Sequence, residues 1–314
     1  MGRFTKYISP QYDFAFKRLF GDQKNADITI SFLNAVLHKK DGEKIVSLTF
    51  LDPHNKKDSS YDKESIVDVR CKDEQGKIYI VEMQVTSERD YEQRSQYYAS
   101  CDVAKQFEHK VGYHKLVPVY FVGILNFNLF RDDKKFYRRL ELVDTTDNIY
   151  TALNHKDFAP LTQFYFIELL KFTKEMKQIK DILDKWAFIL RHATEQEEVP
   201  EEFKKDKALC KAFDVLEFSN LKPEERKQYI KTRENERAYE SIMRQREEEG
   251  EAKGMAKGIA KGMAQGEALG EARGRKEEAV TIALNLINLG LSDEQISSAT
   301  KLSLQEIQHL RLKK

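Results

Sequence analysis

The sequence predicts an α/β protein in which a sheet-forming half is followed by an all-helical half. As far as residue 172, segments rich in β-branched and aromatic residues alternate with segments of helical spacing. After residue 172 no segment has a strand pattern, and helical periodicity dominates. A chain of 314 residues is long enough for one large domain or two modest ones, each with a proper core.

Composition narrows the class of protein before any motif is considered. The chain is 40% hydrophobic and 33% charged, and no apolar run approaches the roughly 20 residues that cross a bilayer. The N-terminal stretch lacks the apolar centre and cleavage site of a signal peptide, so we expect a cytoplasmic protein without membrane contact. The 53 basic and 52 acidic residues give a net charge of +1, so a DNA-binding surface must come from local patches.

Cysteine and histidine patterns exclude several kinds of site. Cys71, Cys101 and Cys210 are far apart and form no C-x-x-C pair, which argues against a zinc site and a disulfide framework. His109 and His114 are the closest histidines, and their spacing does not place them on one helical face. No serine or cysteine motif indicates a nucleophilic triad.

The first helices and strand follow from local signals. Ser9 and Pro10 predict a helix start, and the helix carries Phe16, Leu19 and Phe20 on one stripe before Gly21 ends it. A second amphipathic helix is expected over residues 27–37. The stretch KIVSLTFLDP then reads as a strand closed by its proline.

A hairpin is predicted next, in the stretch SIVDVRCKDEQGKIYIVEMQV. Glu74, Gln75 and Gly76 fit a three-residue loop with glycine in the left-handed conformation at the third position. Opposed residues then have numbers that sum to 150, so Asp68 lies opposite Glu82 on one face. Their Cβ atoms would be roughly 5 Å apart, and like charges at that distance are destabilising unless a cation lies between them.

Both faces of this hairpin are apolar, so burial is expected. Ile66, Ile78 and Ile80 share the face of the acidic pair, and Gln84 points the same way. The opposite face is formed by Val67, Val69, Cys71, Tyr79, Val81 and Met83. Buried carboxylates need a hydrogen-bond network, a proton held by a raised pKa, or a divalent metal, for which Mg²⁺ or Mn²⁺ suits oxygen ligands. The alternative is a solvated face that carries two acids.

Further elements complete the α/β half. A helix capped by Ser87 is predicted over residues 87–108, and the apolar run LVPVYFVGILNF reads as a central strand. A shorter strand is expected around residues 138–142. The stretch LTQFYFIELL fits a strand or a helix. Beyond it, KQIKDILDKWAFILRHA begins the helical half.

Seven glycines then recur at every fourth residue, from Gly250 to Gly274. Four residues is close to one helical turn, so these glycines form a slowly drifting stripe that would let a second helix approach closely. The stretch is either a self-associating helix or a semi-flexible linker. Its many charged residues exclude a membrane helix.

The tail resembles a helix-turn-helix pattern. Gly290 closes an amphipathic helix, and two capping boxes follow, Ser292 with Gln295 and Ser303 with Glu306. The last helix would expose Gln305, Gln308, His309 and Arg311. DNA contact and a small helical cap or dimer-stabilising bundle both fit this pattern. We therefore expect four regions: a core at 1–173, a helical region at 174–249, the glycine segment at 250–276 and the tail at 277–314.

This order of elements resembles the PD-(D/E)XK nuclease fold, with a central mixed sheet flanked by helices. More specifically it resembles the Rpn family of recombination-promoting nucleases, also described as PD-(D/E)XK transposases. The resemblance is carried by YDFAFKRLFG, IVDV, YIVEMQV, the following helix, GYHKLVPVYFVGILNF and FIELLKF. Glycine repeats and a short helical tail are also common in that family, so the resemblance covers nearly the whole chain.

The resemblance implies a metal site. Asp68 and Glu82 would bind Mg²⁺, with the backbone oxygen of Met83 completing the site. Asp13 matches the family's leading acidic residue and could hold the metal or its water shell; a carboxylate favoured by the helix dipole is the equal alternative. Gln84 stands where the motif has lysine, which removes a positive charge, although glutamine is usual there in the resembled family.

Four further residues are candidates for DNA contact. Arg94 would contact a phosphate with support from Tyr98, four residues later on the same helical face. The alternative for Arg94 is packing and a surface ion pair with Glu88, Asp90 or Glu92. Lys17 and Arg18 either contact the DNA backbone or simply form the polar side of their helix. The candidate DNA-binding residues are therefore Arg94, Tyr98, Lys17 and Arg18.

The leading functional hypothesis is a Mg²⁺-dependent DNA endonuclease with little sequence specificity, acting in DNA recombination, mobile-element movement or defence against phage, as the resemblance implies. A second hypothesis is a catalytically inactive DNA-binding or self-associating protein that retains the nuclease fold. A third is a protein-interaction scaffold that depends on the tail.

Overall fold

The computed structural model describes residues 5–55, 65–109, 112–131, 133–144, 151–152 and 160–312. The chain divides into two compact units, Met1–Asn235 and Glu236–Lys314. The region boundaries expected near residues 173, 249 and 276 remain predictions.

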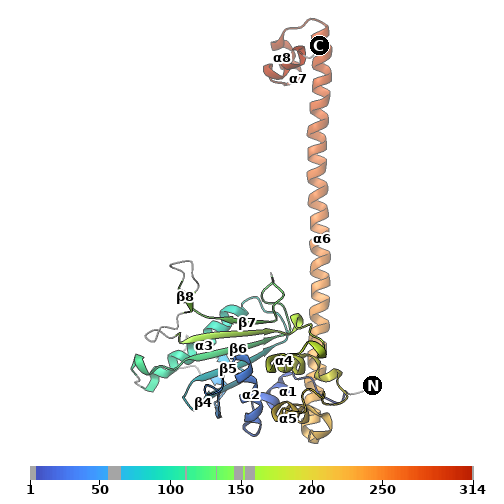
Figure 1. Ribbon diagram of the computed structural model, residues 1–314. Coiled ribbons are helices and arrows are strands. Elements are labelled where there is room, and N and C mark those ends of the chain that lie inside the picture. Colours follow the sequence, from blue (N-terminus) through green and yellow to red (C-terminus); the bar gives the residue numbers. More distant parts are fainter. Residues whose placement is uncertain are drawn as a thin grey trace. The chain divides into compact units, whose positions relative to one another are not determined.

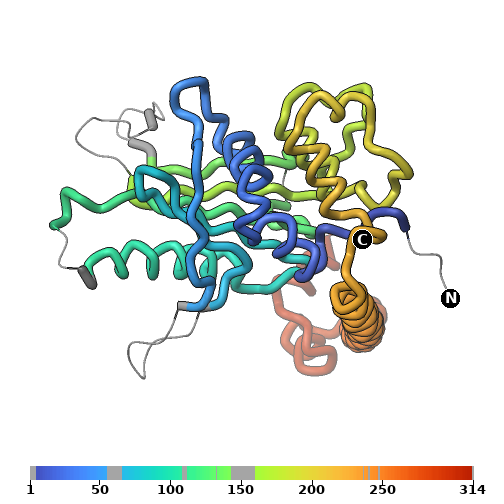
Figure 2. Tube along the Cα trace, turned by 90° about the horizontal axis from the view of Figure 1, so that it is seen from below, coloured from blue at the N-terminus to red at the C-terminus, as the bar shows by residue number. Residues whose placement is uncertain are grey.

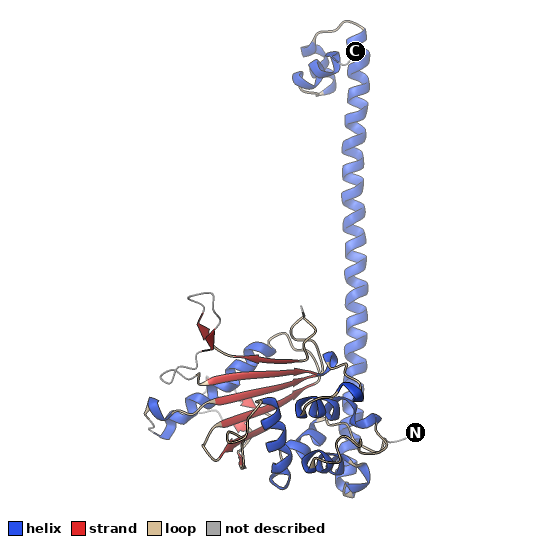
Figure 3. Ribbon diagram, viewed as in Figure 1, coloured by secondary structure: helices blue, strands red, loops and turns tan. Residues whose placement is uncertain are grey.

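A mixed six-stranded sheet forms the centre of the first unit (Figure 3). In spatial order its strands are β1 (Leu48–Phe50), β4 (Val69–Asp73), β5 (Ile78–Gln84), β6 (Val119–Leu125), β10 (Thr162–Glu168) and β7 (Tyr137–Leu140). The central strands β5, β6 and β10 run parallel, and the outer pairings are antiparallel. The α/β prediction is confirmed, and the ambiguous stretch LTQFYFIELL forms a central strand, β10. Two short pairs lie outside this sheet, β2 (His54–Asn55) with β3 (Ser65–Ile66), and β8 (Val143–Asp144) with β9 (Thr151–Ala152).

The predicted hairpin register is confirmed. Val69 pairs with Val81 and Cys71 with Tyr79, so opposed residue numbers sum to 150. The loop closes where expected, because the Asp73 N–H donates to the Lys77 carbonyl at 3.0 Å. Gly76 has a φ of 81°, the left-handed conformation that this loop requires.

Helices cover both faces of the sheet (Figures 1 and 2). Helices α1 (Asp13–Phe20) and α2 (Ala26–Val36) lie on one face, and α3 (Tyr91–Lys105) lies on the other. On the first face they are joined by α4 (Ile182–His192) and α5 (Lys207–Leu216). Single 3-10 turns are η1 (Gln23–Asn25), η2 (Gln106–His109), η3 (Tyr113–Lys115), η4 (Leu169–Lys171), η5 (Met176–Gln178), η6 (Ala193–Glu195) and η7 (Phe218–Asn220).

Two predicted helix starts are wrong. Ser9 does not cap α1; its Oγ accepts from the Gln11 N–H at 3.3 Å and forms a turn, and the helix begins at Asp13. Ser87 does not cap α3, which begins at Tyr91 after an Asp90 that makes no side-chain capping bond. Serine forms such local turns readily, so its presence alone does not fix the first helical residue.

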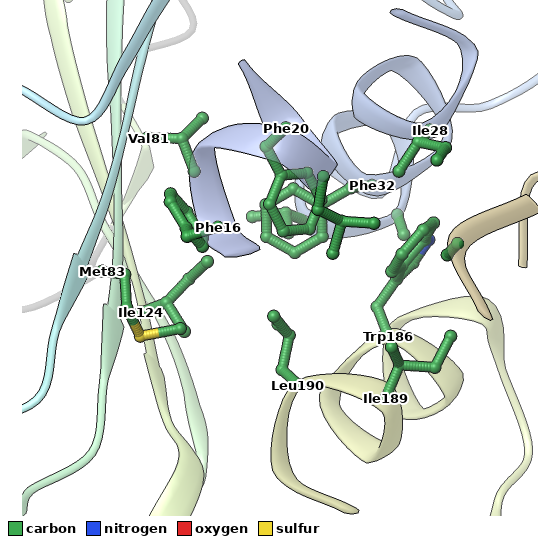
Figure 4. Close-up of a cluster of buried hydrophobic side chains, with 14 of the residues drawn as sticks. Phe16, Phe20, Ile28, Phe32, Val81, Met83, Ile124, Trp186, Ile189 and Leu190 are labelled. Atoms are coloured by element: carbon green, nitrogen blue, oxygen red, sulfur yellow. The ribbon is translucent and has the colours of Figure 1, made fainter. Parts of the chain in front are cut away.

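The larger core lies between the sheet and helices α1, α2, α4 and α5. Figure 4 shows Phe16, Phe20 and Phe32 packed between Trp186 and the sheet residues Val81, Met83 and Ile124. Trp186 is fully buried, and its ring nitrogen donates to the Ser31 hydroxyl at 3.3 Å. Residues beyond 172 therefore help to build the core on which β5 rests.

The hairpin is buried on both faces, as predicted, with two corrections. Ile78 and Ile80 lie in a second core under α3, whereas Tyr79, Val81 and Met83 lie in the larger core. Ile66 is 49% exposed, and Val67 packs with Ile78 in the second core instead of on the opposite face. The alternation fails there because residues 67 and 68 lie outside the strands.

Gly123 lies in the middle of β6 and touches both a strand and α3. A Cβ at this position would lie 2.7 Å from the Tyr91 hydroxyl oxygen and 2.9 Å from a ring carbon of Phe166. We expect Gly123→Ala to lower the free energy of unfolding by about 1–3 kcal/mol in urea titrations, since an overpacked core must shift. Gly250→Ala is the matched control and should not lower the stability, because no described atom outside its own stretch of helix lies within 4 Å of its Cβ position and alanine favours a helix. Equal stability of Gly123→Ala and the wild type would contradict this packing.

The second unit contains most of a long helix and a small helical tail. Helix α6 runs from Pro223 to Asn288 and is continuous through the glycine repeat. After Gly290, which has a φ of 82°, follow α7 (Asp293–Thr300) and α8 (Leu304–Leu312). The tail has its own core of Ala283, Ile287, Ile296, Leu302 and Ile307.

Both predicted capping boxes of the tail are confirmed. Ser292 and Gln295 bond reciprocally, and so do Ser303 and Glu306, at 3.0 and 3.3 Å. Gln305, Gln308 and His309 are exposed, as expected. Arg311 is also exposed, as expected, and within the tail it bonds Asp293 at 2.7 Å and the Leu291 carbonyl at 2.5 Å.

Within the described ranges, no helix combines the length and the apolar composition that crossing a bilayer requires.

Candidate active site

The hairpin brings Asp68 and Glu82 together at one end of the sheet. Asp68 immediately precedes β4, and Glu82 lies near the end of β5. The Asp68 Oδ2 accepts a 2.8 Å hydrogen bond from the Met83 N–H, which holds the Asp68 side chain against β5. The acidic pair predicted from the register is therefore present, and the strand backbone fixes its geometry.

Burial makes both carboxyl groups weaker acids than usual, because it raises their pKa values. Glu82 is 6% exposed, and burial raises its pKa to about 8; Arg94 opposes this shift, and the negative charge of Asp68 adds to it. Burial also raises the pKa of Asp68 to about 6, against the lowering effect of its bond from Met83. The two groups therefore compete for ionisation near neutral pH unless a cation compensates them.

Glu82 also carries an oxygen that lacks a partner. Its Oε2 is buried and accepts no hydrogen bond from any described residue, while its Oε1 lies 3.6 Å from the Arg94 guanidinium. An unsatisfied buried carboxylate oxygen costs free energy, so native proteins normally supply water, a proton or a metal ion. The donor set here suits a hard divalent cation.

A backbone oxygen faces the same place. In a strand, the N–H and C=O of one residue point to the same edge, and the Met83 N–H points to Asp68. The Met83 carbonyl therefore lies on the Asp68 side of β5, beyond the last β4 pairing at Val69. Two carboxylates and one carbonyl fit Mg²⁺ or Mn²⁺, which accept oxygen ligands and retain several waters. Among the described residues, no group of three or more Asp, Glu, His or Cys side chains is close enough to hold a metal.

Gln84 belongs to a network with Arg94 and Glu88. The Gln84 Oε1 accepts from Arg94 at 2.8 Å, and its amide nitrogen donates to Glu88 at 3.0 Å and to the Thr86 carbonyl at 3.1 Å. Arg94 also pairs with Glu88. Both polar atoms of the Gln84 amide are thus engaged by protein atoms. Of the two interpretations of Arg94, the ion pair with Glu88 is present, and phosphate contact stays a prediction. Arg94 also lies beside Glu82.

Aromatic rings flank the arginine. The Arg94 guanidinium lies 5.1 Å from the Tyr91 ring centre and 5.9 Å from that of Tyr98. Such cation–π contacts restrict the guanidinium to the space beside Glu82. Tyr98 is therefore close to Arg94, as its helical spacing predicts.

The remaining candidates on α1 are placed differently. Asp13 and Lys17 form an exposed ion pair at 2.7 Å, and both influence the pKa of Asp68, Asp13 raising it and Lys17 lowering it. Arg18 does not join this group. Its guanidinium binds Glu225 at 2.5 Å and the Val215 carbonyl at 3.2 Å, so it connects α1 to α5 and α6.

Sequence reasoning missed two residues of the site. The Tyr91 hydroxyl is buried and has no hydrogen-bond partner among the described residues. It lies over Gly123, which is the β6 register partner of Glu82, so it approaches the acidic pair from α3. An isolated glycine within an apolar central strand was the available signal, since it often marks a close approach of another group.

The fold and the site together define a class. A mixed sheet covered by helices, with an aspartate and a glutamate meeting at a hairpin, is the restriction-endonuclease-like core of PD-(D/E)XK proteins. The family model described as "PD-(D/E)XK nuclease family transposase" matches residues 10–245, and the chain belongs to this family of nucleases. Comparisons with curated proteins and with solved structures found no match.

Proposed function

We propose that this protein is a Mg²⁺- or Mn²⁺-dependent DNA endonuclease that hydrolyses phosphodiester bonds with little sequence specificity. Its biological setting would be DNA recombination, mobile-element movement or defence against phage. Membership of a nuclease family supports this proposal. The observation that carries it is the buried pair of Asp68 and Glu82, with a Glu82 oxygen that has no hydrogen-bond partner among the described residues.

Asp68, Glu82 and the Met83 carbonyl are the residues that would hold the ion. When bound, a divalent cation polarises the scissile phosphate and lowers the pKa of a water molecule that attacks phosphorus. The protein's part would be to fix these three oxygens, and the Met83-to-Asp68 hydrogen bond supports this role for Asp68. Asp13 would act from α1 on the surrounding water molecules.

Arg94 would supply the positive charge that the motif's lysine provides elsewhere. Gln84 occupies the lysine position, and its Oε1 fixes the Arg94 guanidinium at 2.8 Å. Arg94 also lies 3.6 Å from Glu82, so it can stabilise negative charge that develops on a phosphate at the site. Gln84 is then a positioning residue, Tyr98 restricts Arg94, and Lys17 is a candidate phosphate contact on α1.

This role of Arg94 gives a prediction with an internal rescue. Arg94→Ala should lower the rate of plasmid cleavage about 100-fold, a typical cost of removing one stabilising group at a reacting centre. Adding Gln84→Lys to that variant should restore most of the rate, because lysine then provides the missing cation. Rates would be measured by gel assay at fixed Mg²⁺. Cleavage by Arg94→Ala at the wild-type rate would contradict the role.

A catalytically inactive DNA-binding protein is the second candidate, and the glutamine at position 84 favours it. It predicts that the protein retains DNA at low salt but breaks no strand with Mg²⁺ or Mn²⁺. A scaffold that depends on the tail predicts no DNA retention at all.

The decisive experiment is incubation of the full chain with supercoiled plasmid, with EDTA as the control. Metal-dependent nicking supports the endonuclease, and its absence under every metal would refute it.

We also propose that the chain self-associates through α6, because residues 250–276 are helical and exposed along their whole length.

A further inference from the structure

Helix α6 exposes a face whose residues are arranged symmetrically about Gly262. With 100° of rotation per residue, Glu251, Met255, Leu269 and Arg273 lie within about 20° of the direction of Gly262. Met255 and Leu269 are 70% and 73% exposed. Two apolar side chains thus face solvent on the same side of the helix.

The two sides of Gly262 mirror each other in residue type, with an apolar and then a charged residue at equal distances, and the two charges have opposite sign. Glu251 lies eleven residues before it and Arg273 eleven after; Met255 lies seven before and Leu269 seven after. When two copies of a helix pair in opposite directions, residues equally distant from the two-fold axis lie at the same height. An acidic end would then meet a basic end, and an apolar residue would meet an apolar one.

We propose that two copies of this chain pair through α6 in antiparallel orientation, with Gly262 of one copy against Gly262 of the other. Glu251 then faces Arg273 at both ends of the contact, and Met255 faces Leu269 on both sides of the centre. The contact spans about 33 Å of helix. This inference adds an orientation and a register to the proposed self-association, and it does not depend on nuclease activity.

Other arrangements oppose like charges or leave charges unpaired. A parallel pair in register places Glu251 against Glu251 and Arg273 against Arg273, which is repulsive. Sliding the antiparallel pair by one helical turn places Glu251 opposite Leu269 in one direction and opposite Glu277 in the other. The register centred on Gly262 is therefore the favourable one of these four.

The surface of α6 leaves room for a second helix. No described atom outside their own stretch of helix lies within 4 Å of the Cβ positions of Gly258, Gly262 and Gly266, which lie on the same face. A hollow on this face is lined in part by Leu269, Arg273 and Val280. The bond of Arg273 to Glu277, at 3.1 Å, joins two highly exposed side chains, and such pairs contribute little. Arg273 can therefore turn to a partner helix.

Disulfide cross-linking of the full chain tests the centre of the contact. The background variant carries Cys101→Ser and Cys210→Ser; Cys71 is buried and stays. Gly262→Cys should form a covalent dimer under mild oxidation. Ala260→Cys is the matched control, because it points about 160° away from the proposed face and should remain monomeric on a non-reducing gel. Absence of the Gly262→Cys dimer would overturn the proposal.

A mixing experiment tests the direction. Met255→Cys and Leu269→Cys proteins should cross-link to each other, and neither should cross-link to itself, if the helices are antiparallel in this register. Self-linked Met255→Cys dimers would indicate parallel helices and would overturn the proposal.

Charge reversal gives an independent readout. Arg273→Glu should raise the dissociation constant of the dimer about tenfold in sedimentation equilibrium, because symmetry creates two repulsive contacts. Glu251→Arg combined with Arg273→Glu should restore it. Failure of the double variant to recover would overturn the pairing, whereas plasmid nicking by the same proteins reports separately on the proposed nuclease.

Discussion

Glu82→Gln and Asp68→Asn should each reduce Mg²⁺-dependent plasmid nicking by about 100-fold to 1,000-fold. Both substitutions keep the size of the side chain and remove only its ability to carry negative charge. Glu82 contributes a buried oxygen that no described residue hydrogen-bonds, and Asp68 is held beside it by the Met83 N–H. Loss of either carboxylate would remove one of the few protein ligands of the ion. The remaining ligands do not compensate for that loss in a buried site.

The matched control for this experiment is Glu43→Gln. Glu43 is an exposed carboxylate in the loop after α2 and does not belong to the candidate site, and its removal changes the formal net charge by the same amount. It should nick plasmid at the wild-type rate. If Glu82→Gln and Glu43→Gln nick equally fast, Glu82 has no role in hydrolysis, and the proposed site is wrong.

The second large effect concerns stability and pH. In the absence of metal, Glu82→Gln should unfold at a higher temperature than the wild type at pH 8, and the two proteins should be similar near pH 4. The folded pKa of Glu82 is about 8, against an ordinary value of 4.5, so the folded state retains a proton that the unfolded chain releases. The contribution of Glu82 to stability is thus largest below pH 4.5 and is lost as the pH rises toward 8.

Each pH unit in that window changes the free energy of unfolding by up to about 1.4 kcal/mol, so the total is a few kcal/mol. Asp68 acts in the same direction, between its ordinary 3.8 and about 6. Glutamine has no proton to lose, so its variant should show a flatter curve. Thermal unfolding from pH 4 to pH 8 with EDTA measures both curves. Parallel curves for the two proteins would show that Glu82 is not buried as described.

Mg²⁺ or Mn²⁺ should reverse the wild-type loss, because a bound cation replaces the proton. The rise in melting temperature with metal should be larger at pH 8 than at pH 5, and Glu82→Gln should show little rise at either pH.

The acidic pair could be predicted from the sequence because local rules determine its geometry. A three-residue loop with Gly76 at the left-handed position fixes the hairpin register from Lys72 to Val69, and continuing that register by one residue places Asp68 near Glu82. The apolar residues on both sides of the pair then indicate burial. No long-range information is needed for any of these steps, which is why they are confirmed.

The arrangement around the pair depends on long-range contacts, and there the sequence is less informative. Arg18 adjoins Lys17 in the sequence, yet it binds Glu225, some 200 residues later, and is unavailable to the site. Gln84 could be recognised as a departure from the lysine of the motif, but its bond to Arg94 follows from how α3 packs on the sheet. The close approach of Tyr91 to Gly123 depends on the same packing.

Direct binding of Mn²⁺ tests the central claim, that Asp68 and Glu82 form a divalent-cation site. Electron paramagnetic resonance at pH 8 counts bound Mn²⁺ without requiring a substrate or any catalytic activity. We expect saturable binding to the wild type that Mg²⁺ displaces, and a loss of that binding in both Asp68→Asn and Glu82→Gln. Equal binding of Mn²⁺ by the wild type and the two variants, or no binding by the wild type, would contradict it.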